Sequence, residues 1–235
     1  MIRFRYDAAV LGRFPTIRGG VILAEGLRGG PTPPALRDTF QGEQQAVLAR
    51  IGDTPLAELP SLAAWRSAFR GFGVEPTQFR SAAEALLRRL TKKGDIPGIN
   101  RLVDLGNLVS IRYAMPVAVF DTRAMTGTVT VRLAEGNERF TELGSDAVVH
   151  PEPGEVIFVD EAGLVSARRW CWRQSAQSAS REDTTAALIT VEGHHDGAEA
   201  DVRAAVADLL ALLAEYAGGR YASAVLSPDN PAFEA

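Results

Sequence analysis

The stretch Trp65–Asp121 decides the fold; it reads WRSAFRGFGVEPTQFRSAAEALLRRL over 65–90, GDIPGINRLVDLGNLVS over 94–110 and AMPVAVFD over 114–121. Ser81 with Glu84 three residues later is a capping-box pattern, so we expect a helix from 82 until Gly94 ends it. A Pro-Gly pair then bends the chain, and Asn100 is a suitable cap for the helical segment that follows. The stretch therefore predicts two short helices, a rigid loop and the start of a third helix.

Outside this stretch, the spacing of apolar residues predicts the remaining elements. Helices are expected over 34–51, 61–70 and 198–217, and strands within 2–27 and repeatedly after Met115, including ARRWCWRQS over 167–175. The end of the chain, SPDNPAFEA, is expected to be loosely ordered. The predicted fold class is α+β, with mixed or antiparallel sheets packed against several helices. We expect one domain over 1–235, with an N-terminal lobe (1–58), a core region (59–193) and a C-terminal helix and tail (194–235).

Composition places the chain among cytoplasmic proteins. It has 235 residues and 46% hydrophobic content, enough for one sizeable core. No apolar stretch reaches the roughly 18 residues needed to span a bilayer, and the first residues lack the apolar block of a secretory signal. The single cysteine, Cys171, excludes an internal disulfide framework and indicates a reducing compartment.

Charge is unevenly distributed along the chain. The net charge is −4, which by itself argues against a nucleic-acid partner. Between residues 65 and 101, however, eight cations face three acids, an excess of five, whereas the end of the chain after Glu192 is acidic. A local basic face is compatible with transient RNA contact; the alternative is an ordinary solvated helix surface. The eight cations are Arg66, Arg70, Arg80, Arg88, Arg89, Lys92, Lys93 and Arg101.

The sequence predicts neither a metal site nor a covalent nucleophile. His194 and His195 are adjacent, and neighbouring side chains diverge, whereas a zinc site needs ligands that converge. Cys171 would need an activating base and partial exposure to act as a nucleophile, so we expect it to be a packed, inert thiol. No Gly-x-Ser-x-Gly motif is present.

Two polar patterns are candidates for a binding site. In a strand RRWCWRQS, alternation places Arg168, Trp170, Trp172 and Gln174 on one face, where the aromatic rings are able to stack on a base or an amino-acid side chain, and Cys171 on the opposite face. The alternative is that the tryptophans are core residues and the arginines pair with Asp160 or Glu155.

The second pattern is a polar stripe. Asn100, Asp104, Asn107 and Ser110 share one face if their segment is helical. Such a stripe is either a solvent face or one wall of a pocket. A lined pocket is suited to ester hydrolysis, which needs donors for the oxyanion and a positioned water but no protein nucleophile.

Three blocks of the chain carry a resemblance to a known family: WRSAFRGFGVEPTQFRSAAEALLRR, INRLVDLGNLVS followed by PVAVFD, and PGEVIFVDEAGLVSARRWCWRQS. Over roughly residues 59–193 the chain resembles the B3/B4 domain of the bacterial phenylalanyl-tRNA synthetase beta subunit, and the WRxAF and WxWRQ blocks resemble its freestanding members. The residues that match the family pattern are Val103, Asp104, Asn107, Pro116, Phe120 and Asp121, while Ala118 occupies the family's histidine position.

The resemblance implies a trans-editing deacylase that hydrolyses the ester bond of mischarged aminoacyl-tRNA without a covalent intermediate. In the synthetase this module edits tyrosyl-tRNA(Phe). By match, the resemblance implies that Asn107 lines the substrate pocket, that Asp104 is its structural partner and that Glu192 lies where the synthetase has a glutamate that recognises the tyrosine hydroxyl. We expect Asn107, Glu192 and Asn100 to be the catalytic residues, which position water or the substrate amine. Ala118 and the bulky RRWCWRQ segment depart from the synthetase, and they imply a pocket narrowed by Trp170 and Trp172.

The expected partners are aminoacylated tRNA and its amino-acid moiety, with no DNA, membrane, metal or cofactor. The alternative is a non-catalytic module that binds tRNA, other RNA or an amino acid and keeps the same fold. The amino acid, the tRNA and the oligomeric state are not indicated by the sequence.

Overall fold

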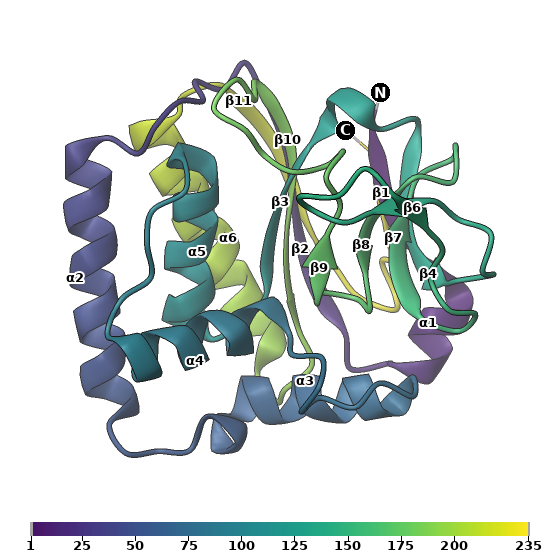
Figure 1. The fold of residues 1–235 in the computed structure, drawn as a ribbon, viewed down its shortest axis with the longest axis horizontal. Helices are drawn as coiled ribbons and strands as arrows, with labels where there is room; N and C mark the ends of the chain where they lie inside the picture. The colour runs from purple at the N-terminus through teal and green to yellow at the C-terminus, as the bar shows by residue number, and fades with distance from the viewer. Residues whose placement is uncertain (1, 235) are drawn as a thin grey trace.

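Helices cover one face of a four-stranded sheet, and a six-stranded sheet covers its other face (Figure 1). The computed structural model describes residues 2–234. Its α-helices are α1 (Ala8–Arg13), α2 (Pro34–Ile51), α3 (Pro60–Gly71), α4 (Ala82–Lys93), α5 (Arg101–Tyr113) and α6 (Ala198–Tyr216), with 3-10 turns η1 (Leu56–Glu58) and η2 (Thr122–Ala124). Its strands are β1 (Arg3–Tyr6), β2 (Arg18–Glu25), β3 (Val117–Asp121), β4 (Thr128–Leu133), β5 (Phe140–Thr141), β6 (Val148–Val149), β7 (Val156–Val159), β8 (Val165–Arg168), β9 (Arg173–Gln174), β10 (Ala186–Gly193), β11 (Arg220–Leu226) and β12 (Ala232–Glu234).

Both sheets draw strands from distant parts of the chain. The four-stranded sheet has the order β11-β2-β10-β3 and is antiparallel throughout. The six-stranded sheet has the order β12-β1-β4-β7-β8-β9 and is mixed, because β1 and β4 run parallel. A separate pair, β5 and β6, is antiparallel. The α+β class with mixed and antiparallel sheets is therefore confirmed.

Alternation along the central strands divides the interior into two cores. On β10, Ile189 and Val191 join the core on the helix side, while Leu188 joins the core between the sheets. The residues that alternate with Ile189 and Val191 thus point between the two sheets, and they include Thr190 and Glu192. This is how a carboxylate at the end of an apolar strand comes to lie in the interior.

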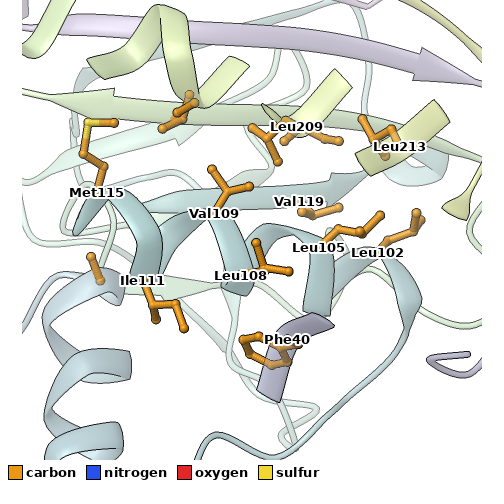
Figure 2. Close-up of a cluster of buried hydrophobic side chains, with 14 of the residues drawn as sticks. Phe40, Leu102, Leu105, Leu108, Val109, Ile111, Met115, Val119, Leu209 and Leu213 are labelled. Carbon is orange, nitrogen blue, oxygen red and sulfur yellow. The ribbon is translucent and has the colours of Figure 1, made fainter. Parts of the chain in front are cut away.

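Helix α5 lies in the middle of the helix-side core. Its Leu108 points toward Phe40 of α2, and Leu105 lies close to Val119 of β3 (Figure 2). Leu209 of α6 closes the same cluster (Figure 2). Helix α5 is therefore held on several sides by apolar contacts, and the polar side chains of its remaining face are rigidly placed.

The predicted helix ends are confirmed. Ser81 Oγ accepts the Glu84 amide at 3.3 Å, and Gly94 ends α4 in the left-handed region with φ of 81°. Asn100 Oδ1 accepts the Val103 amide at 3.0 Å, so it caps α5 as expected. None of the helices within residues 2–234 has the length and apolar character needed to cross a bilayer.

Two local predictions are wrong. The segment 167–175 is not one strand, because Arg169 and Trp170 adopt positive φ of 45° and 59° and form a tight turn between β8 and β9. The end of the chain is not loose either, because Ala232–Glu234 pairs with β1. The sequence predicted one or two strands near the N-terminus and no helix there, whereas a short helix, α1, separates β1 from β2.

Candidate functional site

Two adjoining cavities lie where the tryptophan-rich turn meets β3, α4 and α5. The inner cavity has a volume of about 80 Å³ and lies between the sheets. Its lining includes Ala118 of β3, Phe158 of β7, Ala167 of β8, Thr190 and Glu192 of β10, and Trp170, Cys171 and Trp172 of the turn. The outer cavity has a volume of about 360 Å³, and its lining includes Leu86 and Arg89 of α4, Ile99 just before α5, Val103 and Asn107 of α5, and Trp172.

Glu192 is the acidic group of the inner cavity. Its side chain is buried, and its Oε1 accepts hydrogen bonds from Tyr6 Oη at 2.6 Å and from Trp170 Nε1 at 3.1 Å. Within residues 2–234 no protein donor bonds to the other oxygen, Oε2. Burial raises the pKa of Glu192 to about 7, and the two hydrogen bonds lower it only in part. The carboxyl group is thus poised between its charged and neutral forms near neutral pH.

Tyr6 reaches Glu192 because a glycine lies opposite it. Gly19 pairs with Glu192 across β2 and β10, and a Cβ atom on Gly19 would lie 2.0 Å from the Tyr6 hydroxyl. Burial, together with the neighbouring carboxyl, raises the pKa of Tyr6 well above its usual value, so the phenol stays a donor. A residue of the first strand therefore completes a site whose carboxyl lies 186 positions further along the chain.

Trp65, Trp170 and His194 form an aromatic cluster behind Glu192. The ring of His194 lies 4.6 Å from that of Trp65 and 5.0 Å from that of Trp170, both edge-to-face. Trp65 Nε1 donates to the Glu192 carbonyl at 3.3 Å. Burial lowers the pKa of His194 to about 3, so the imidazole is neutral at physiological pH. The cluster holds the end of β10 in place and brings no cation to Glu192.

Asn107 is the predicted polar residue that reaches a cavity from α5. It is half-buried and lines the outer cavity. The other members of the stripe are occupied with the backbone: Asn100 Nδ2 donates to the Ser180 carbonyl at 3.0 Å, and Ser110 Oγ donates to the Met115 carbonyl at 2.7 Å. Asp104 accepts from the Thr32 hydroxyl and from the Ile99 amide, and burial raises its pKa. Asn100 and Asp104 line neither cavity.

The tryptophan segment differs from a regular strand, and this changes which residues meet. Trp170, Cys171 and Trp172 all line the inner cavity, so the expected separation of Cys171 from the tryptophans is wrong. Burial raises the pKa of Cys171 well above its usual value, which keeps the thiol protonated. Gln174 lines both cavities.

Arg168 lies outside both cavities. Its Nη2 donates to Glu155 Oε1 at 2.7 Å, and its Nε donates to Glu155 Oε2 at 3.1 Å. Arg168 therefore forms a buried ion pair with Glu155, which is the alternative that the sequence left open.

The predicted cations fall into two groups. Arg66 pairs with Glu84 at 2.7 Å, Arg80 lies 3.8 Å from the same carboxylate, and Arg101 donates to the Arg28 carbonyl. The exposed members are Arg70, Arg88, Arg89, Lys92 and Lys93, which we call the basic surface. Arg89 pairs with Asp95 at 3.7 Å and belongs both to the basic surface and to the outer cavity, so the basic surface extends to the cavity.

The side chains of His194 and His195 point in different directions, as expected for neighbouring residues. His194 lies in the aromatic cluster, whereas His195 Nε2 lies 2.9 Å from Asp201 on α6. Sequence reasoning missed Tyr6, Gly19 and Trp65 as partners of Glu192. Their spacing along the chain carries no signal, because Gly19 reaches Glu192 by strand pairing, Tyr6 from the facing sheet and Trp65 from α3.

A known protein family matches most of this chain. The B3/4 domain family matches residues 64–218. The phenylalanine–tRNA ligase beta subunit of Geobacter metallireducens is 31% identical over 162 residues, which cover 60% of this chain and 20% of that protein. The corresponding subunit of Shewanella oneidensis is 27% identical over 115 residues, covering 49% and 14%. The chain thus corresponds to a minor part of these relatives.

The fold also has a counterpart among solved structures. An N-terminal fragment of the phenylalanyl-tRNA synthetase beta subunit from Pyrococcus horikoshii matches with a TM-score of 0.50 at 14% identity. The match covers 94% of this chain and 50% of that fragment. At this identity the likeness concerns the fold alone.

Proposed function

Because the chain belongs to the B3/4 domain family, we propose that it is a trans-editing deacylase that hydrolyses the ester bond of mischarged aminoacyl-tRNA. The observation that carries the proposal is the pair of adjoining cavities, one small and closed by a buried carboxyl, the other larger and reached by a basic surface. An aminoacyl ester on tRNA has the matching parts: a side chain, an ester group and a polyanionic chain.

The inner cavity is proposed to hold the amino-acid side chain. Its lining is mostly apolar, with small residues at Ala118 and Ala167 that leave the space open. Glu192 Oε2 is the acceptor offered to a bound ligand, and it suits an ammonium or hydroxyl group of the amino acid. This assigns recognition to Glu192 and shape to Trp170 and Trp172.

The outer cavity is proposed to hold the ester and the terminal nucleotide. The Asn107 amide is the polar group that α5 presents there, and it has the donor needed to orient a water or to stabilise the oxyanion. Water adds to the acyl carbon, the ester C–O bond breaks, and the proton passes to the departing ribose oxygen. Asn100 contributes through α5, whose first turn it caps. The protonated Cys171 thiol takes no covalent part.

The basic surface is proposed to contact the tRNA backbone. Lys92 and Lys93 are exposed at the end of α4, and Arg89 carries the same charge to the outer cavity. Cations placed beside a site in this way position a nucleic acid without reading its sequence. A cytoplasmic location, where aminoacylated tRNA is used, is part of this proposal.

A non-catalytic module is the second candidate, and Ala118 favours it. Ala118 lines the inner cavity at the position where the phenylalanyl-tRNA synthetase module carries a histidine. Without that histidine, Glu192 is the acidic group that remains beside the ligand space. Such a module would bind aminoacyl-tRNA with a steep salt dependence and release it unchanged.

The test is hydrolysis of a panel of mischarged tRNAs by the full chain, compared with Asn107→Ala. We expect release of the amino acid from at least one pair, and a strong reduction in the variant. Binding without hydrolysis on any pair, at concentrations where an established editing enzyme works, would support the non-catalytic module instead.

A further inference from the structure

Trp172 separates the two cavities, and this position suggests a specific role. Resting on the proposed function, we propose that Trp172 is the partition that determines specificity: it limits the bound amino acid to a side chain smaller than a benzene ring. The substrate class is then tRNA that carries a small amino acid, of the size of alanine, serine or threonine. Aromatic amino acids are excluded by the partition.

The wall between the cavities has one large member. The residues that line both spaces are Ala82, Val117, Trp172 and Gln174. Gln174 is tied in place, since its Nε2 donates to the Val119 carbonyl at 2.9 Å and to the Ser178 carbonyl at 2.6 Å. Ala82 and Val117 are small. The bulk of the partition is therefore the indole of Trp172.

The indole is held by cations and an aromatic edge. The Arg169 guanidinium lies 4.6 Å from the Trp172 ring and that of Arg173 lies 4.7 Å from it. Phe79 meets the same ring at 5.0 Å and 88°, and Arg169 lies 3.9 Å from Phe79. Glu155 pairs with Arg169 at 3.2 Å, which holds the guanidinium in place. These contacts hold the Trp172 indole in place, so the boundary between the inner and the outer cavity is fixed.

The turn between β8 and β9, which carries Trp172, has an unusual backbone conformation. Arg169 and Trp170 both have positive φ, a conformation that costs roughly 1–3 kcal/mol for each residue other than glycine. This turn brings Cys171 to the same cavity as Trp170 and Trp172, whereas a regular strand would place Cys171 on the opposite face. Strain at a ligand site is commonly functional, and here it accompanies the partition.

Volume gives the size limit. The inner cavity measures about 80 Å³, close to half of the roughly 150 Å³ of an apolar cavity that admits benzene. The outer cavity measures about 360 Å³. Removing the indole joins the two, and the merged space then has room for a phenyl or phenol ring.

The experiment measures binding, which does not depend on hydrolysis. Isothermal titration of the full chain with L-alaninamide, L-serinamide, L-threoninamide and L-phenylalaninamide gives the size ranking for wild type and Trp172→Ala. We expect wild type to prefer the small amides. The variant should gain on the order of tenfold or more in affinity for L-phenylalaninamide relative to L-alaninamide, because even one methylene changes discrimination by roughly 10-fold or more.

Two further measurements separate a partition from general damage. Leu86→Ala enlarges the outer cavity without touching the inner one, so its size ranking should equal that of wild type. Indole added to Trp172→Ala should refill the partition and restore the preference for small amides. Trp172→Phe serves if the alanine variant does not fold, with an intermediate ranking expected.

An unchanged ranking in the Trp172 variants would overturn the partition, as would the lack of binding of every amide by both proteins. If the ranking changes as expected but wild type hydrolyses no mischarged tRNA, the partition stands and the deacylase proposal fails. If hydrolysis occurs but the variant keeps the wild-type ranking, the deacylase stands and the partition fails.

Discussion

Replacing Glu192 by glutamine should change how stability depends on pH. Glu192 is fully buried, and burial raises its pKa from 4.5 to about 7. The folded protein thus keeps this proton over a range in which the unfolded chain has already released it. Glutamine has nearly the same shape as the protonated carboxyl but does not titrate. Comparing the two proteins therefore gives the free energy that ionisation of Glu192 costs the folded state.

The sign and size follow from proton linkage. Between pH 4.5 and 7 the native state binds more protons at this site than the unfolded state, so the free energy of unfolding falls as pH rises. The difference of 7 minus 4.5, or 2.5 pKa units, corresponds to about 3 kcal/mol at 1.36 kcal/mol per unit. Below the unfolded pKa the contribution is fully present, and above about pH 7 it is lost.

The assay is urea unfolding of wild type and Glu192→Gln from pH 4 to 8.5. Subtracting the two curves at each pH removes the titration of all other groups. We expect the stability of the variant relative to wild type to be constant below about pH 4.5. It should then rise by about 3 kcal/mol and level off above pH 7.

Tyr6→Phe supplies the matched control. The Tyr6 hydrogen bond lowers the pKa of Glu192, so its removal should move the transition to higher pH while leaving the direction unchanged. A difference between wild type and Glu192→Gln that stays flat from pH 4 to 8.5 would refute the reasoning, since it would mean that Glu192 ionises as easily in the folded protein as in the unfolded chain.

Three further outcomes are expected. Asn107→Ala should lower the hydrolysis rate by about 100-fold, as for loss of one oxyanion donor, with an unchanged urea midpoint; equal activity would remove Asn107 from the reaction. Gly19→Ala should lower the free energy of unfolding by about 1–3 kcal/mol, because the new methyl displaces the Tyr6 hydroxyl, and a neutral result in urea unfolding would contradict the close packing. Neutralising four cations of the basic surface should weaken tRNA binding. In filter binding, the slope of log K against log salt concentration should become less steep by up to about 0.9 for each phosphate that is no longer neutralised. An unchanged slope would place the tRNA on another surface. These cations are Arg88, Arg89, Lys92 and Lys93.

The parts of the fold with local causes could be predicted from the sequence. The Ser81 and Asn100 caps and the Gly94 end depend on hydrogen bonds within a few residues, and the structure forms them as expected. The position of Glu192 at the end of a buried strand follows from the same local reasoning. Asn107 could be placed on one face of its helix, although the sequence did not show that its neighbours in the stripe bond to the backbone.

The parts with distant causes could not be predicted. Tyr6 meets Glu192 only because β2 and β10 pair in one sheet while β1 belongs to the other. The left-handed backbone at Arg169 and Trp170 has no sequence signal, because such residues rarely adopt positive φ. The strand pattern of RRWCWRQS therefore indicated the right residues but the wrong geometry, and Trp172 as a partition became visible only with the turn.

The charge environment of Glu192 separates it from the other buried glutamates. Glu84, Glu138 and Glu155 each pair with at least one arginine, whereas within residues 2–234 no cation pairs with Glu192 and its donors are the neutral Tyr6 and Trp170. An ionised carboxyl without a cation costs about 3 kcal/mol at neutral pH by the pKa argument, a large share of the roughly 5–15 kcal/mol of a typical domain. Core packing alone does not explain that cost, since glutamine would fill the same space. A carboxyl whose second oxygen is left without a protein donor, in the wall of a cavity, is instead suited to a donor brought by a ligand.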